Sequence, residues 1–291
     1  MVRGKVIEFE GLDGSFKETN AKRLYEHLKE KGYNVNIVSF PRYECNSSFF
    51  VKKFLTGAYG VQDGVNPMII NKFYALDRYD YVETFNVRKR IENGEWFIFD
   101  RYVGSSLLYQ SANSINKTTR ERAQNLMFNF EYEVLNLPKP NLVIAMKSNF
   151  EMTVKSLEKK DKKDAIERNL TYLKKINEIY DDLIKKYSWC PIDILTEDET
   201  EFRNKDDVFN DILDLIDKKL IPKQIEYINR TVNTDIIIKN AVSKCKYVDQ
   251  YFKSASRMIS ETGFCKGIDI ESSCNSCIFC EKNQVFKPKD M

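Results

Sequence analysis

The sequence contains almost no histidine, which excludes a broad class of sites. His27 is the only histidine in 291 residues. Imidazole is the side chain best suited to proton transfer near neutral pH, and it is also the commonest ligand for transition metals. A catalytic dyad or a metal centre built on histidine is therefore almost excluded, and we expect the chemistry to come from other side chains.

Long apolar runs and a strong net charge are missing as well. No stretch approaches the roughly 20 apolar residues that a membrane helix needs. The net charge of +3 is too small to indicate binding to nucleic acid or to an anionic membrane surface. Met1–Lys5 leads directly into a predicted strand, so we expect no signal peptide. These absences predict a cytoplasmic protein without a membrane or nucleic-acid partner.

Cysteine is present but unevenly placed. Four of the seven cysteines lie within the last thirty residues, which does not predict a disulfide framework in a reducing compartment. Tetrahedral Zn²⁺ takes four thiolates or imidazoles, and C-x₂-C pairs supply two at a time, so the run predicts a structural zinc site. An iron–sulfur cluster with a distant fourth ligand and a site without metal stay open. The candidate ligands are Cys265, Cys274, Cys277 and Cys280, whereas Cys45, Cys190 and Cys245 are predicted to be lone thiols.

Five short apolar runs alternate with helical patterns through residues 1–220. This alternation is typical of an α/β fold in which helices cover both faces of a parallel sheet. The predicted strands are Lys5–Glu10, Tyr33–Phe40, Glu95–Asp100, Leu142–Met146 and Cys190–Leu195. The predicted helices are Lys17–Lys31, Ser47–Leu55, Pro67–Asn93, Ser105–Ala112, Arg120–Leu137, Phe150–Glu158, Ala165–Lys186 and Phe202–Leu220.

The alternation stops near Ile221, where we predict a domain boundary. Residues 221–291 contain one further helical pattern, Asp235–Ile259, ahead of the clustered cysteines. A small appendage with few large apolar residues would gain folding free energy from a bound metal. We therefore predict a domain of residues 1–220 and a metal-stabilised extension of residues 221–291, which is structural or binds a protein partner.

The first predicted strand runs into a glycine-bearing turn and then into a helix that starts at a lysine. This order is the layout of a phosphate-binding loop, G-x-x-x-x-G-K-[ST], whose backbone amides and lysine hold phosphate groups. Gly11 and Lys17 have the spacing of the motif. Phe16 occupies the position of its second glycine, and Glu18 that of its hydroxyl residue. The turn is therefore predicted to be a variant phosphate-binding loop.

Three residues of this turn have physical consequences. Lys17 is predicted to contact the transferred phosphate, although a solvated lysine at a helix start would have the same pattern. A left-handed backbone at Phe16 would cost about 1–2 kcal/mol, and the ring could crowd the phosphates. Glu18 could ligate Mg²⁺, because carboxylates suit that ion.

Arginines lie at the ends of other predicted strands. Ligands of parallel sheets bind beyond the carboxyl ends of the strands, and both Arg42 and Arg101 come close after such an end. Arg78 lies on the long predicted helix, where a single arginine is most often a surface ion pair. A guanidinium fork grips a phosphate bidentately and stabilises charge during phosphoryl transfer, so we predict that all three face a phosphate site.

Asp13, Asp100 and Tyr74 are further candidates, each with a structural alternative. The two aspartates could contact a substrate hydroxyl or a metal ion, but an aspartate at a helix start is also a common cap. Tyr74 could stack on a base, although an aromatic side chain on a helix is more often part of the core. The lysine-rich run 159–163 is either a solvated segment or a lid that closes over phosphates.

Taken together, these motifs resemble the thymidylate kinase family. The resemblance covers about residues 4–220, its motifs occur in the order of the family, and the extension lies outside it. The matching segments are Phe9–Ser15, Phe40–Arg42, Tyr74–Arg78, Asp100–Tyr102, Tyr109–Gln110, Leu137–Asn141 and Asp164–Glu167.

The resemblance implies a P-loop kinase fold with a five-stranded parallel sheet, usually in a homodimer. It also implies the reaction, which is transfer of phosphate from ATP·Mg²⁺ to dTMP. On the donor side, the residues that bind ATP are then Gly11, Gly14, Ser15, Lys17, Glu18 and Thr19. The implied catalytic residues are Lys17, Arg101, Asp13 and Asp100, of which Asp100 belongs to the metal and phosphate network.

The resemblance also assigns the acceptor side. Asp13 would contact the sugar hydroxyl of dTMP, Tyr74 would stack on thymine, and Gln110 would lie beside the base. The residues implied to hold the acceptor phosphate are Arg42, Arg78 and Arg101, with Arg101 also near the transferred group.

The departures from the family pattern fall on the donor side. Besides Phe16 and Glu18, Ala165 stands where many bacterial members have a lid arginine, although some bacterial members are similar in carrying glutamate at the position of Glu18. A lysine of the run 159–163 could supply the lid charge, but lysine does not reproduce the arginine fork. Two hypotheses follow: an active dTMP kinase, or a catalytically impaired nucleotide-binding module that acts through its extension. The acceptor base, whether thymine, uracil or a modified pyrimidine, stays open.

Overall fold

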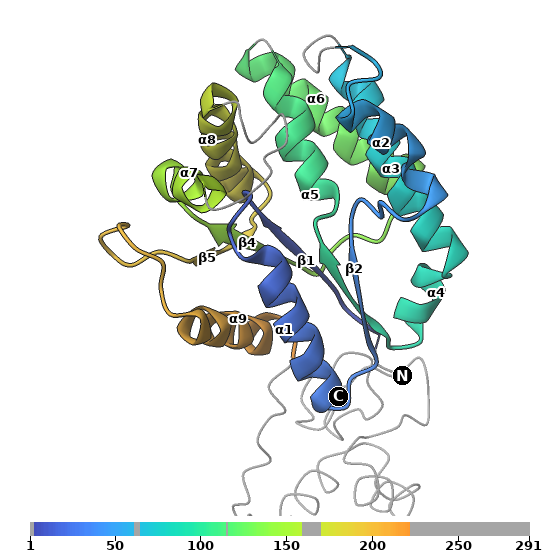
Figure 1. Ribbon diagram of the computed structural model, residues 1–291. Coiled ribbons are helices and arrows are strands. Elements are labelled where there is room, and N and C mark those ends of the chain that lie inside the picture. The colour runs from blue at the N-terminus through green and yellow to red at the C-terminus, as the bar shows by residue number, and fades with distance from the viewer. Residues whose placement is uncertain (1–2, 61–64, 115, 159–169, 222–291) are drawn as a thin grey trace, which may run out of the picture. The chain divides into compact units, whose positions relative to one another are not determined.

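A five-stranded parallel sheet forms the centre of the fold (Figure 1). The computed structural model describes residues 3–60, 65–114, 116–158 and 170–221. The strands pair in the order β2-β3-β1-β4-β5. The predicted five-stranded parallel sheet is confirmed, and its central strand is the one that leads into the glycine-bearing turn. The strands are β1 (Val6–Gly11), β2 (Val35–Ser39), β3 (Trp96–Asp100), β4 (Leu142–Lys147) and β5 (Cys190–Asp193).

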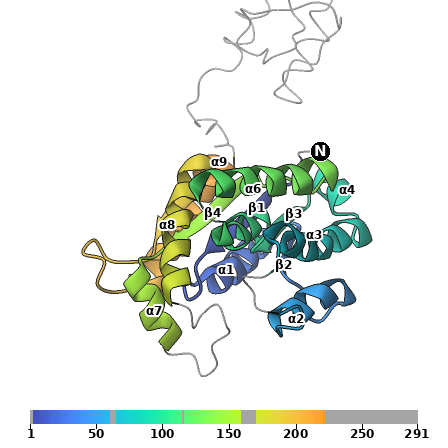
Figure 2. The same cartoon turned by 90° about the horizontal axis from the view of Figure 1, so that it is seen from above.

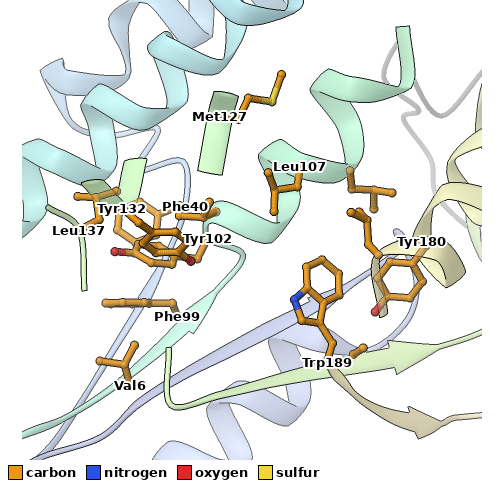
Figure 3. Packing of buried hydrophobic residues seen from close by; sticks show 14 of the residues in the cluster. Val6, Phe40, Phe99, Tyr102, Leu107, Met127, Tyr132, Leu137, Tyr180 and Trp189 are labelled. Carbon is orange, nitrogen blue, oxygen red and sulfur yellow. The ribbon is translucent and has the colours of Figure 1, made fainter. Parts of the chain in front are cut away.

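Helices cover both faces of this sheet, as Figure 2 shows from above. Ile7 and Phe9 of β1 belong to an apolar layer shared with α1 and α9. Val6 belongs to the layer on the opposite face, where Phe99 and Tyr102 stack with ring centroids 4.5 Å apart (Figure 3). The helices of the first face are α1 (Lys17–Glu30) and α9 (Lys205–Lys219), and those of the opposite face are α3 (Pro67–Thr84), α4 (Val87–Glu92), α6 (Lys117–Asn129) and α8 (Leu170–Lys186).

The prediction of one helix over Pro67–Asn93 is wrong in its middle. α3 ends at Thr84, and α4 begins again at Val87. Asn86 between them has φ 49°, a left-handed conformation that asparagine tolerates better than most residues. No glycine or proline marks this break, so the helical pattern alone did not reveal it.

Two other predicted helices change their winding. α6 begins at Lys117, three residues before the predicted start, because Asn116 and Thr119 form a reciprocal capping box. The helix predicted to continue to Leu137 ends at Asn129 and is followed by a π-turn at Phe130–Val134. The helix predicted over Ser105–Ala112 is a short α5 (Val103–Ser105), a second π-turn (Ser106–Gln110) and a 3₁₀ turn (Ser111–Asn113). Such wide turns occur frequently at functional sites.

The remaining helices are short. A 3₁₀ turn, Asn46–Ser48, leads into α2 (Phe49–Leu55), and α7 (Phe150–Glu158) follows β4. Within the described ranges, no helix is both long and apolar enough to cross a membrane. The lysine run 159–163, Ala165, the predicted helix Asp235–Ile259 and the four clustered cysteines lie outside the described residues, so these predictions and the domain boundary near Ile221 stay predictions.

Candidate active site

The turn after β1 depends on two glycines because other chain segments approach it closely. A Cβ on Gly11 would lie 3.0 Å from the Met146 carbonyl oxygen and would contact the Ser15 hydroxyl. Gly14 has φ 80°, and a Cβ there would lie 2.7 Å from Cβ of Ser156 on α7. The turn is therefore held between β4 and α7, with its backbone at the carboxyl edge of the sheet.

Phe16 adopts a left-handed backbone conformation. Its φ and ψ are 60° and 22°, and it is the N-cap residue of α1. Its ring packs edge-on against Phe202, with centroids 5.0 Å apart, at the margin of the apolar layer beneath α1 and α9. The backbone strain is thus offset by apolar packing of the ring.

Replacing Phe16 by glycine tests this balance. Phe16→Gly removes a strain of about 1–2 kcal/mol together with ring packing of similar worth, so we expect the free energy of unfolding to change by less than about 1 kcal/mol. Phe202→Ala keeps the strain and loses the packing, so it should destabilise the protein by about 1–2 kcal/mol. Urea unfolding of both variants measures the difference. Equal destabilisation by the two substitutions would show that the strain at Phe16 has no measurable cost.

Lys17 lies inside the turn, with its side chain withdrawn from solvent. Only 6% of its surface is exposed, and Nζ donates a hydrogen bond of 2.7 Å to the Leu12 carbonyl oxygen. Burial, reinforced by the nearby positive charge of Arg101, lowers the pKa of Lys17 to about 8, while Asp13 and Asp100 act in the opposite direction. Two cationic side chains therefore converge on one turn, which is the arrangement that a phosphate group stabilises.

Two buried polar atoms beside this turn lack a hydrogen-bond partner within the described part of the chain. They are the Ser15 hydroxyl oxygen and Oδ1 of Asp100, whose Oδ2 accepts a hydrogen bond of 3.0 Å from Ser39. An unpartnered buried polar atom is costly, so both are suited to a bound group. A phosphate group with Mg²⁺ fits them, because carboxylates are preferred Mg²⁺ ligands.

Glu18 and Thr19 follow Lys17 on α1. Glu18 forms an ion pair of 2.5 Å with Lys22, and both side chains are 66% exposed. Its pKa is lowered chiefly by the hydrogen bond from Lys22. Glu18 therefore lies on the solvent side of α1, whereas Asp100 is the buried carboxylate with an unpartnered oxygen.

Arg101 lies directly beyond the end of β3 and faces the turn. Its φ of 63° is left-handed, and its backbone N–H donates to the Phe9 carbonyl oxygen of β1 at 3.0 Å. Its guanidinium forms an ion pair with Asp13 and donates a long hydrogen bond of 3.4 Å to the Tyr109 hydroxyl. The structure thus brings Asp13, Lys17, Asp100 and Arg101 together at one edge of the sheet.

Arg42 and Arg78 lie in carboxylate networks. Arg42 donates from its backbone N–H to the buried Asp77 at 2.7 Å and from Nη2 to Asp80 at 2.6 Å. Arg78 is 2% exposed and makes two hydrogen bonds of 2.7 Å to Glu131 on the π-turn Phe130–Val134. The charge of each guanidinium is therefore balanced by protein groups.

Tyr74 lies one helical turn before Arg78 on α3 and is half-buried. Burial raises the pKa of its phenol, as does Tyr43, while the positive charges of Arg101 and Arg78 oppose that rise. Tyr74 therefore lies within electrostatic range of both arginines. Gln110 is buried in the π-turn Ser106–Gln110 on the same side of the sheet.

Sequence reasoning missed the groups that orient these arginines. Glu131 and Asp77 are completely buried. Glu131 lies outside the matching segments, and Asp77 lies inside Tyr74–Arg78 but was not singled out. Glu8 and Glu10 are also buried on β1. Two glutamates within a predicted buried strand are unusual, and this pattern could have identified them as candidates from the sequence. A buried carboxylate indicates a partner, but it does not tell which residue that partner is.

A parallel sheet in this order, with a lysine-bearing phosphate turn after its central strand, places the protein among the P-loop phosphotransferases. The family model described as Thymidylate kinase matches residues 9–204. The chain therefore belongs to the thymidylate kinase family, and its activity is the phosphorylation of dTMP to dTDP. Both the predicted family and the predicted reaction are confirmed.

Individual relatives agree with this assignment. The chain is 28% identical to a thymidylate kinase of Caldicellulosiruptor saccharolyticus, over 75% of this chain and 98% of that protein. It is 27% identical to a thymidylate kinase of Plasmodium falciparum, over 78% of this chain and 96% of that one. A solved structure of thymidylate kinase from Candida albicans matches the fold with a TM-score of 0.57 and 19% identity, covering 74% of this chain and 92% of that chain.

Proposed function

We propose that this chain uses ATP as its phosphate donor and that Lys17 and Arg101 supply the positive charge for the transfer. The observation that carries this proposal is the convergence of their two side chains beside the unpartnered atoms of Ser15 and Asp100. The transferred phosphoryl group carries negative charge on its outer oxygens, and fixed cations stabilise it most in a site that excludes water.

The surroundings of each residue indicate its proposed role in the transfer. Lys17 exchanges its hydrogen bond with the Leu12 carbonyl oxygen for the outer phosphates of the donor. Arg101, oriented by Asp13, holds the acceptor phosphate close to the transferred group. When bound, Mg²⁺ would supply further positive charge beside Asp100. Positioning and electrostatics then account for the rate enhancement without a covalent intermediate.

Arg42 and Arg78 are proposed to contribute hydrogen-bond donors more than net charge. Asp77 and Asp80 balance the charge of Arg42, and Glu131 balances that of Arg78. Tyr74 is proposed to stack on the base and Gln110 to lie beside it, with Asp13 also near the sugar hydroxyl. Gly11, Gly14 and Thr19 complete the proposed donor site around the phosphates.

Diphosphate production from purified protein tests the proposal, with ATP and Mg²⁺ supplied and dTMP, dUMP, dCMP and dGMP offered in parallel. We expect turnover with dTMP well above the other acceptors. One methyl group discriminates by about 1–3 kcal/mol, so dUMP is the most informative competitor. Binding of dTMP without turnover would instead support the impaired module, which no described residue favours over the enzyme.

The pKa of Lys17 gives the donor site a defined dependence on pH. Only protonated Lys17 carries the charge that attracts phosphate, and its protonated fraction falls as the pH rises through about 8. We therefore expect kcat/KM for ATP, which reports the free enzyme, to fall above about pH 8. Lys17→Arg should move this fall to higher pH, because arginine stays protonated. A flat profile up to about pH 10 would contradict the proposed role.

The homodimer implied by the family resemblance is part of the proposal. α3 exposes Ile69, Leu76 and Tyr79, and α6 exposes Leu126. The two helices contact each other, and large apolar side chains exposed on neighbouring helices can form an interface. Sedimentation equilibrium would measure the state of association, and a monomer at micromolar concentration would contradict the proposal.

For the extension we propose a zinc site formed by Cys265, Cys274, Cys277 and Cys280, with a structural role or a role in binding a protein partner. The tight spacing of these cysteines supports it. Elemental analysis of the purified protein tests it, since one zinc per chain is expected, and iron with sulfide would indicate a cluster instead. We also propose a cytoplasmic location, in keeping with thiolate ligands that must stay reduced.

A further inference from the structure

Two carboxyl groups are buried side by side on the central strand, beneath the segment that carries Arg101. Glu8 and Glu10 are 1% and 0% exposed, and both point to the face opposite α1. A buried carboxylate is costly unless it is hydrogen-bonded and its charge is compensated. The proposed phosphoryl transfer uses neither residue directly, so their presence calls for a physical explanation.

Both carboxyl groups hold the backbone that follows Arg101. Oε1 of Glu10 accepts hydrogen bonds from the N–H groups of Tyr102 and Ser105 at 2.9 and 2.8 Å, and Oε2 accepts from the Ser105 hydroxyl at 2.8 Å. Oε1 of Glu8 accepts from the N–H of Gly104 at 2.8 Å. The segment 102–105 is thus fixed to β1 by four hydrogen bonds, and Arg101 immediately precedes it.

The packing at Gly104 shows how closely the carboxyl groups are fitted. A Cβ at this position would lie 2.8 Å from Oε1 of Glu8, 2.9 Å from Cγ of Glu10 and 3.0 Å from the ring of Trp189. A glycine is therefore required here by space, since real Cβ atoms do not approach other atoms so closely. The two carboxyl side chains therefore pack directly against Gly104, and a larger residue at this position would displace them.

The positive charge around the two carboxyl groups is unequally shared. Within the described ranges, the groups that face Glu8 are Glu10 on β1, Arg78 on α3, Tyr102 before α5 and Tyr132 on the π-turn Phe130–Val134. Arg78 is the cation beside Glu8, and it is already paired with Glu131. Glu10 interacts with the cations Lys17 and Arg101 and lies near Tyr109 and Tyr180. Burial, and next the charge of Glu10, raise the pKa of Glu8 well above its ordinary value.

We propose that Glu8 and Glu10 are positioning residues that share one proton and together hold Arg101 in its place at the acceptor site. Glu10 is the acceptor of three donors, which suits an ionised carboxylate. Glu8 is neutral and donates its proton toward Glu10, while its other oxygen receives the N–H of Gly104. This inference rests on the proposed function only for the role of Arg101.

The protonation of Glu8 is tested by stability, without any activity measurement. Above the ordinary glutamate pKa, a carboxyl group that stays protonated in the folded protein holds a proton that the same group loses in the unfolded chain. The free energy of unfolding therefore falls as the pH rises toward the pKa of that group in the folded protein. Glu8→Gln removes this loss. Its Tm relative to the wild type should therefore rise by roughly 5 °C between about pH 5 and pH 8.

A matched control is Glu133→Gln, which neutralises a 61% exposed glutamate paired with Lys139. The difference in Tm between Glu133→Gln and the wild type should stay nearly constant over the same range, because exposed ion pairs contribute little to stability. A constant difference for Glu8→Gln as well would show that Glu8 is ionised in the fold, and the shared proton would be ruled out.

The positioning role is tested by separating the two substrates. Glu8→Gln keeps a neutral hydrogen-bonding group and should leave KM for dTMP within about threefold of the wild type, whereas Glu8→Leu should raise it about tenfold. KM for ATP should stay within about twofold in both variants. Wild-type KM for dTMP in Glu8→Leu, or equal increases for both substrates, would overturn the positioning role. A wild type without turnover would refute the proposed function instead, and the stability test would still decide the protonation of Glu8.

Discussion

Substituting Lys17 by alanine is expected to reduce kcat by about 10³-fold or more while dTMP still binds with nearly wild-type affinity. The side chain occupies the centre of the turn, and a preorganised cation beside a transferred phosphoryl group is worth several kcal/mol in a site that excludes water. The acceptor residues around Tyr74 and Arg101 lie on other elements, so their contacts with dTMP do not depend on Lys17.

Lys22→Ala is the matched control for this experiment. Lys22 lies five residues further along α1 and forms an exposed ion pair with Glu18, and exposed ion pairs contribute little to stability. Turnover should therefore stay within about twofold of the wild type. Steady-state kinetics and calorimetric titration with dTMP separate the two effects. Unchanged turnover in Lys17→Ala would show that the phosphate-binding turn has been assigned wrongly.

Substitutions of Arg101 are expected to have the second large effect, and the two obvious variants should differ. Arg101→Ala removes the charge and should lower kcat by about 10³-fold or more, in the range found for arginines that stabilise phosphoryl transfer. Arg101→Lys keeps the charge but loses the planar fork. It should therefore recover part of the activity, because lysine can neutralise charge but cannot hold the acceptor phosphate and Asp13 at once.

Arg90→Lys provides the comparison for the lysine variant. Arg90 makes a similar ion pair, with Glu95 at 2.7 Å, but it lies at the opposite end of the sheet, beside the start of β3. The activity of the Arg90→Lys variant should match that of the wild type. If Arg101→Ala kept its turnover within about threefold of the wild type, the charge proposed for the acceptor side would have to come from another residue.

The fold could be predicted because it depends on local patterns that the chain repeats. Short apolar runs separated by helical periodicity indicate a parallel sheet, and the spacing from Gly11 to Lys17, together with the motifs further along the chain, indicates a phosphate-binding turn. The sequence left the sign of φ at Phe16 open, and the folded turn shows that it is positive. Errors occurred where no residue type marked the change, as at Asn86, where a left-handed residue divides a continuous helical pattern.

The partners of the site residues could not be predicted in the same way. Arg78 appeared as a lone arginine on a helix, yet it meets Glu131, 53 residues away, inside the protein. Glu10 contacts residues more than 90 positions further along the chain. Such pairs form only when the sheet and its covering helices pack, so the local sequence does not contain them.

The amino-acid sequence alone was therefore enough for the class of fold, the phosphate-binding turn and the family, because these depend on residue types at short and regular spacing. Tertiary packing decided which charges stay available. It paired Arg42 and Arg78 with buried carboxylates, brought Lys17 close to the ion pair of Arg101 with Asp13, and placed Glu8 and Glu10 under the backbone that follows Arg101. The physical reason is that burial strengthens electrostatic interactions, and burial is a property of the assembled layers.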